Sequence, residues 1–130
     1  LGPLKKPMTK LAVEKATELG VTTIQPISLD HGQHDLTDDD IHKLKVVAIE
    51  ASEQSERMTV PNICPQITLS NLVNSLKDQF KIIACVERTN TEPIITAFES
   101  VAVECKLDSV AILIGPEGGF SPKEIDLLAE

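Results

Sequence analysis

The 130-residue sequence has almost no aromatic side chains, with three Phe, no Tyr and no Trp. Proteins that hold single-stranded nucleic acid commonly stack its bases on aromatic rings, and this chain lacks the residues for that mode of binding. Cations are also scarce, because 12 Lys and Arg stand against 20 Asp and Glu, for a formal net charge of −8. Phosphate attraction needs clustered Lys and Arg, so the charge argues against a nucleic-acid surface on this chain alone.

Long apolar runs and cysteine pairs are absent too. No run approaches the roughly 18 apolar residues of a membrane span, and the N-terminus has no signal-peptide pattern. Cys64, Cys85 and Cys105 are odd in number and widely spaced, which is typical of reduced thiols in a cytoplasmic protein. The three histidines have no cysteine pair at zinc spacing beside them, and the nearby Asp residues are explained by helix capping, so no metal site is predicted.

Hydrophobic periodicity and breaker residues predict strands that alternate with helices. We expect helices at about 8–19, 38–57, 71–76 and 93–99 and from 122 onward, strands at 21–29, 80–87 and 109–114, and an extended connector at 60–69. The last two strands are continuous apolar runs. This pattern is typical of an α/β domain in which helices cover both faces of a parallel sheet.

The first predicted helix carries an apolar stripe with a cation on it. Met8, Leu11, Ala12 and Leu19 form the stripe, and Lys15 falls among them. The Lys15 stem could cover apolar surface while its amine stays in water, or the cation could have a functional role. In the second predicted helix Thr37 and Asp40 form a capping box.

The most informative stretch is ILIGPEGGFSPKEI, residues 112–125, where a buried strand meets a glycine-rich turn and a capped helix. No Lys-Ser or Lys-Thr pair follows the glycines, the spacing is not that of a dinucleotide fingerprint, and Glu117 would repel a phosphate. The turn suits a ligand that is neutral or cationic at its point of contact, such as an adenosine with a sulfonium centre. A tight turn with no ligand remains the alternative.

Three segments together resemble one family. KATELGV (15–21), IEASEQSERMTVP (49–61) and IGPEGGFSPKEI (114–125) occur in the order and at the spacing found in the bacterial 16S ribosomal RNA uridine-N3 methyltransferases of the small-subunit methyltransferase E type, in the SPOUT class. The resemblance implies an α/β-knot domain with a C-terminal trefoil knot, S-adenosylmethionine as cofactor, a homodimer, and methylation of N3 of a uridine in 16S ribosomal RNA of the small ribosomal subunit.

The same resemblance implies how residues 1–130 are organised. They correspond to the methyltransferase domain, without the N-terminal PUA-like RNA-binding domain and the knot-closing C-terminal segment of the family, so we expect the knot to be incomplete in this stretch. Basic surface on those segments would reconcile an RNA substrate with a charge of −8.

Site residues follow from the matched motifs. Gly115, Pro116, Glu117, Gly118 and Gly119 match one cofactor loop, and Val86 and Glu87 look like another. Lys15, Glu53, Gln54 and Arg57 match positions that face the RNA.

The resemblance also suggests catalytic roles. Arg57 is the candidate for stabilising the uridine anion, and Glu117 is the candidate for accepting the N3 proton. Arg57 could instead form an ordinary helix-surface ion pair with Glu53. The alternative function is a non-catalytic RNA- or protein-binding or dimerisation module with the same fold.

Overall fold

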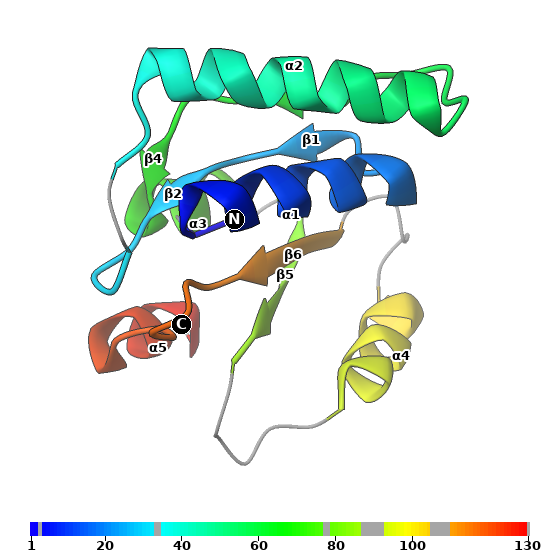
Figure 1. The fold of residues 1–130 in the computed structure, drawn as a ribbon. Coiled ribbons are helices and arrows are strands. Elements are labelled where there is room, and N and C mark those ends of the chain that lie inside the picture. Colours follow the sequence, from blue (N-terminus) through cyan, green and yellow to red (C-terminus); the bar gives the residue numbers. More distant parts are fainter. Residues whose placement is uncertain (3, 33–34, 77–78, 87–92, 105–109, 130) are drawn as a thin grey trace.

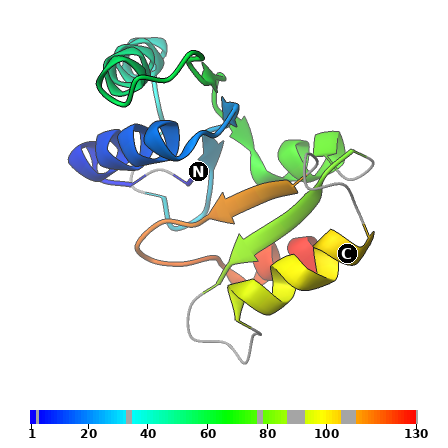
Figure 2. The same cartoon turned by 90° about the vertical axis from the view of Figure 1, so that its right-hand side faces the viewer.

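The computed structural model describes residues 1–2, 4–32, 35–76, 79–86, 93–104 and 110–129. Its elements are α1 (Lys6–Leu19), β1 (Thr23–Ile24), β2 (Ile27–Ser28), α2 (Asp38–Gln54), β3 (Asn62–Ile63), β4 (Ile67–Thr68), α3 (Leu69–Leu76), β5 (Lys81–Cys85), α4 (Ile94–Glu104), β6 (Val110–Ile114) and α5 (Pro122–Ala129). The strands pair in parallel as β1–β3, β2–β4 and β5–β6. Helices α1 and α2 lie on one side of the strands, and α4 and α5 lie on the other (Figures 1 and 2). The prediction of a mixed α/β fold with parallel strands is confirmed.

The predicted strand at 21–29 is divided into β1 and β2 because proline interrupts the ladder. Pro26 has no N–H to donate, and Pro65 interrupts the partner strand in the same way. The Gln25 side chain spans the gap, donating from Nε2 to the carbonyls of Pro26 at 2.9 Å and Pro65 at 2.6 Å. The segment predicted as an extended connector at 60–69 contains two short paired strands, β3 and β4.

Helices α1 and α2 pack together over β1 and β3 around the first hydrophobic core, which contains Val13, Ile24, Ile41, Leu44, Ala48 and Ile63. The predicted apolar stripe of α1 is not the buried face, because Met8, Leu11 and Leu19 are 46%, 45% and 85% exposed. The buried face is Thr9, Val13 and Thr17. Thr17 can be buried because its hydroxyl donates to the carbonyl of Val13 at 2.7 Å.

Helix α2 ends three residues earlier than the sequence predicts. The N–H of Arg57 bonds to Ser52 O at 2.9 Å, and the N–H of Glu56 bonds to Glu53 O at 3.2 Å, the pair of contacts that defines a Schellman end. Glu56 occupies the left-handed position, with φ 54°. Arg57 therefore lies beyond the end of the helix.

The second hydrophobic core joins β2, α3, β6 and the turn before α5 through Ile27, Leu69, Leu72, Leu113 and Phe120. Helices α3 and α5 cover only one face of the β5–β6 pair. On the other face Ile112 and Ile114 are 51% and 47% exposed, and Cys85 is exposed as well. Helix α4 contacts β5, and Ile83 on the same face as Cys85 is only 8% exposed, so within the described residues helices cover this second face in part.

Residues Leu1 and Gly2 connect the β2–β4 pair with the β5–β6 pair. The N–H of Ile27 in β2 donates to Leu1 O at 3.0 Å, and the N–H of Gly2 donates to the carbonyl of Ile114 in β6 at 2.8 Å. The loop after β2 and the turn after β6 consequently meet at the same edge of the molecule.

Candidate functional site at the glycine turn

The chain turns sharply where β6 ends. The N–H of Gly119 donates to Pro116 O at 2.9 Å, and Gly119 has a positive φ of 71°, which favours glycine. The predicted cap of α5 is present, because Ser121 N–H donates to Glu124 Oε2 at 2.7 Å and Glu124 N–H donates to Ser121 Oγ at 3.4 Å. The turn is held between a paired strand and a capped helix.

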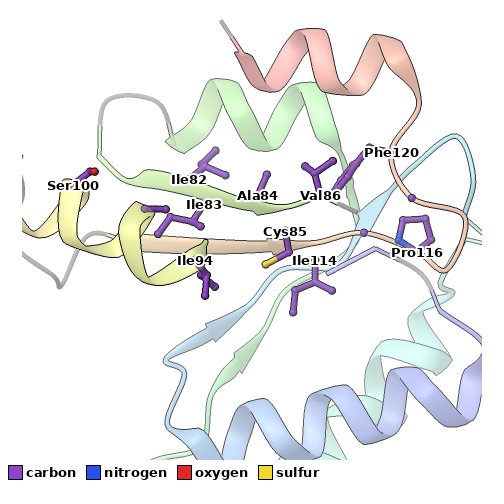
Figure 3. Close-up of a pocket in the computed structure, with 13 residues that line it drawn as sticks. Ile82, Ile83, Ala84, Cys85, Val86, Ile94, Ser100, Ile114, Pro116 and Phe120 are labelled. Carbon is purple, nitrogen blue, oxygen red and sulfur yellow. The ribbon is translucent and has the colours of Figure 1, made fainter. Parts of the chain in front are cut away.

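A cavity of about 780 Å³ opens between this turn, the end of β5 and α4. Its lining is Ile82, Ile83, Ala84, Cys85, Val86, Ile94, Ala97, Ser100, Ile114, Gly115, Pro116, Gly119 and Phe120 (Figure 3). Ligand sites in parallel sheets lie at the carboxyl ends of strands, and a cavity of a few hundred cubic ångströms suits a drug-sized or cofactor-sized molecule. The position and volume therefore fit a nucleoside-sized ligand.

The chemistry of the lining also fits such a ligand. Among the described lining residues none carries an Asp, Glu, Lys or Arg side chain, and polar side-chain groups come from Cys85 and Ser100. The described lining offers a phosphate no cation, whereas an adenosine can be held by apolar contact and backbone groups.

The structure separates the predicted cofactor residues into two groups. Val86, Gly115, Pro116 and Gly119 line the cavity. Glu117 and Gly118 are exposed in the turn and are not part of the lining. Glu87 lies outside the described residues.

The three glycines of the turn meet different surroundings. A Cβ on Gly115 would come within 2.9 Å of the Phe120 ring, and a Cβ on Gly118 would come within 3.0 Å of the His31 Cβ. A Cβ on Gly119 would meet nothing within 4 Å. Of these three, Gly119 alone leaves open space where a Cβ would be, while Gly115 and Gly118 allow close packing.

Sequence reasoning missed the loop after β2. His31 contacts the backbone of the turn and Asp30 contacts the N-terminus of α5. An Asp-His pair directly after a parallel strand is the pattern that could have suggested it, because carboxyl ends of parallel strands share one edge.

Arg57 lies at the other edge of the sheet. Its guanidinium packs over Gly20, with Nη1 2.6 Å from where a Cβ of Gly20 would be. Gly20 precedes β1, whereas Glu117 follows β6, so the strands separate these residues. The structure does not bring the two predicted catalytic residues together within one chain.

Two more residues predicted to face RNA precede Arg57 by a few positions. Glu53 and Gln54 are exposed at the end of α2, and Arg57 forms no ion pair with Glu53. The early end of α2 removes the helical spacing that such a pair needs.

The Lys15 ammonium bonds to carboxylates rather than standing free in water. It lies 2.8 Å from Glu14 Oε1 and 2.8 Å from Glu18 Oε1. These hydrogen bonds, first to Glu14 and then to Glu18, raise the pKa of Lys15 above its usual value.

The described part of the chain lacks both a metal site and a membrane-spanning helix. It contains no group of three or more His, Cys, Asp or Glu placed to hold a metal ion. None of its helices is both long and apolar enough to span a membrane.

A family model described as "RNA methyltransferase domain" matches residues 1–130. The chain belongs to this RNA methyltransferase family. It is 33% identical over 126 residues to the Ribosomal RNA small subunit methyltransferase E of Rickettsia conorii, with 97% of this chain and 49% of the relative covered. The protein of the same name from Bacillus subtilis is 29% identical over 123 residues, with 91% and 48% covered.

Solved structures agree with the family assignment. A Legionella pneumophila protein assigned as a methyltransferase, solved in complex with the bound cofactor SAM, matches with a TM-score of 0.78 and 27% identity over 98% of this chain and 51% of that one. The chain spans about half the length of the curated relatives it matches. The sequence comparison thus shows the family of the domain, and the structural comparison shows its fold.

Proposed function

We propose that the protein is an S-adenosylmethionine-dependent methyltransferase that modifies N3 of a uridine in 16S ribosomal RNA, in the cytoplasm. The observation that carries the proposal is the cavity of about 780 Å³ between the glycine turn and the end of β5, whose described lining has no charged side chain, in a chain of an RNA methyltransferase family. The relatives named for the small ribosomal subunit support the choice of RNA. No observation favours the non-catalytic alternative.

The cavity residues would hold the cofactor by shape and backbone contact. Gly115, Pro116 and Gly119 would contact the adenosine part, and Val86 would pack against it from the end of β5. When bound, S-adenosylmethionine supplies a methyl group on a positively charged sulfur. The apolar lining would keep water away from that group.

The acceptor needs help from ionisable side chains. Uridine N3 carries a proton in its neutral form, so the site must remove it as the new N–C bond forms, and the bond between methyl carbon and sulfur breaks. Glu117 is exposed in the turn beside the cavity and could accept the proton. Arg57 would stabilise the negative charge on the uracil ring.

We further propose that the protein is a homodimer and that Arg57 acts at the cavity of a second copy. Within one chain Arg57 and Glu117 lie at opposite edges of the sheet, so a single copy cannot place both at one acceptor. We also propose that the intact protein forms the C-terminal trefoil knot that the family resemblance implies.

The direct test combines binding and product analysis. Calorimetry should detect S-adenosylhomocysteine binding to the intact protein, and nucleoside mass spectrometry of treated, unmodified 16S RNA should detect 3-methyluridine. Gly119→Val should remove binding, because the branched side chain would enter the cavity at a positive-φ position. Unmodified RNA together with unimpaired cofactor binding would point to another acceptor.

The dimer proposal has its own test. An Arg57→Ala chain and a Gly119→Val chain, each inactive alone, are co-refolded in equal amounts. If Arg57 acts across the interface, mixed dimers contain one intact site and the mixture regains about a quarter of wild-type activity. No recovery, with mixed dimers confirmed by mass, would place Arg57 in its own subunit's chemistry or in a structural role.

A further inference from the structure

The loop after β2 is attached to the start of α5 by two contacts. The backbone N–H of Asp30 donates to Glu124 Oε1 at 2.8 Å, and the hydroxyl of Ser121 donates to Asp30 Oδ2 at 2.7 Å. Glu124 is 8% exposed and Ser121 is 6% exposed, so both contacts are shielded from water. This attachment fixes the backbone immediately before His31.

His31 bonds to the glycine turn with one ring nitrogen. Its Nδ1 lies 3.2 Å from Gly118 O and 3.3 Å from Gly119 O. Carbonyl oxygens only accept, so Nδ1 must carry a proton and donate to them. The two acceptors thereby specify the protonated form of Nδ1.

The contact acts on the outer side of the turn. Gly118 allows the imidazole to come close, because a Cβ there would lie 3.0 Å from the His31 Cβ. Gly119, whose carbonyl shares the same donor, lines the cavity. A change in the His31 bond would therefore move backbone that borders the cavity.

We propose that His31 is a positioning residue, held in place by Asp30, that fixes the Gly118 and Gly119 carbonyls so that the inner side of the turn has the shape required for cofactor binding. This inference rests on the proposed function. Nothing in the family assignment or in the glycine motif specifies a partner for the outer side of the turn.

Three substitutions of His31 distinguish the effect of the position of the hydrogen-bond donor from the effect of side-chain size. Asparagine places an N–H donor on the atom after Cγ, where Nδ1 lies, whereas glutamine places its donor one bond farther out. His31→Ala has no donor. His42→Ala, at an exposed histidine on α2, is the matched control.

Two measurements on the intact protein are needed. The first is exchange of the Gly119 amide hydrogen, which bonds to Pro116 O, without cofactor. The second is calorimetric affinity for S-adenosylhomocysteine. His31→Ala and His31→Gln should each speed the exchange and weaken the affinity about fivefold to tenfold, as expected for a lost hydrogen bond, with His31→Asn and His42→Ala near wild type.

The outcomes are distinguishable. A wild-type protein that does not bind S-adenosylhomocysteine overturns the proposed function, while the exchange data still decide whether His31 holds the turn. Wild-type binding with unchanged affinity in His31→Ala overturns the positioning role and leaves the function standing. Equal losses in His31→Asn and His31→Gln would show that the donor position is irrelevant and would also overturn the inference.

Discussion

At the scale of single residues, Glu124 links the site to the fold. One carboxylate oxygen accepts from the N–H of Asp30 at 2.8 Å, and the other accepts from the N–H of Ser121 at 2.7 Å. The side chain is 8% exposed. A single acid thus caps α5 and anchors the loop that carries His31.

Glu124→Gln should be destabilising, because an amide NH₂ would replace one oxygen and face a backbone N–H. The expected loss in the free energy of unfolding is about 1–3 kcal/mol, the cost of a buried unsatisfied donor. Urea unfolding measures it. Glu117→Gln makes the same charge change at an exposed position of the turn and should stay within about 0.5 kcal/mol of wild type. Equal effects of the two substitutions would contradict this account of Glu124.

The glycine turn shows how far residue patterns alone can predict a site. The apolar run before Gly115 and the cap at Ser121 and Glu124 are local features, so the turn was predictable from sequence. The partners of its glycines were not, because the Phe120 ring and His31 are brought in by tertiary packing. Sequence reasoning consequently assigned all three glycines to the ligand, whereas Gly118 faces His31.

At the scale of elements, α1 shows a related limit. Its apolar residues recur at helical spacing, but the face that packs against α2 contains Thr9 and Thr17 instead. Threonine can take such positions because its hydroxyl bonds to the preceding turn, as Thr17 does to Val13. Helix formation was predictable here from local periodicity, but the buried face was set by the neighbouring helix.

The end of α2 offers a prediction about stability. Glu56 has a φ of 54°, a conformation that costs an L-residue roughly 1–2 kcal/mol. Glu56→Gly should therefore stabilise the protein, by about 0.5–1 kcal/mol after the added freedom of the unfolded chain is counted. Glu50→Gly removes the same charge inside α2 and should cost about 1 kcal/mol. Thermal unfolding compares them, and destabilisation by both would argue against the left-handed cap.

The start of α2 offers a prediction about pH. The Thr37 hydroxyl, followed by the Thr37 N–H and the Lys6 ammonium, lowers the pKa of Asp40 from 3.8 to about 2. Because the folded-state pKa is the lower one, this stabilisation is present above about pH 4 and disappears as the pH falls through about 2.

Thr37→Ala should raise the pKa of Asp40 toward 3.8, since it removes the largest cause of the shift. Carbon-13 titration of the Asp40 carboxyl measures this change. Lys6→Met removes a weaker cause and should move the titration less. A larger effect of Lys6→Met would show that the charge of Lys6, not the capping box, controls Asp40.

At the scale of the whole molecule, the charge distribution limits what this chain can bind. Lys6, Lys15 and Lys43 each form ion pairs with neighbouring acids, namely Asp40, Glu14 with Glu18, and Asp39. Each of these cations therefore already has a carboxylate partner in a chain of net charge −8. An RNA phosphate would have to compete with carboxylates for each of them.

The 130 residues alone should therefore bind single-stranded 16S RNA with a Kd weaker than about 10⁻⁴ M at physiological salt, the weak end of non-specific binding.

Substituting both Glu14→Gln and Glu18→Gln frees Lys15 and should tighten RNA binding. The slope of log K against log salt should become steeper by about 0.7 if one phosphate contact forms. Glu117→Gln with Glu50→Gln makes the same total charge change away from Lys15. Fluorescence anisotropy across a salt series compares the two. An equal gain from both pairs would mean that net charge alone governs RNA binding, whereas a gain confined to the first pair would place the RNA beside α1.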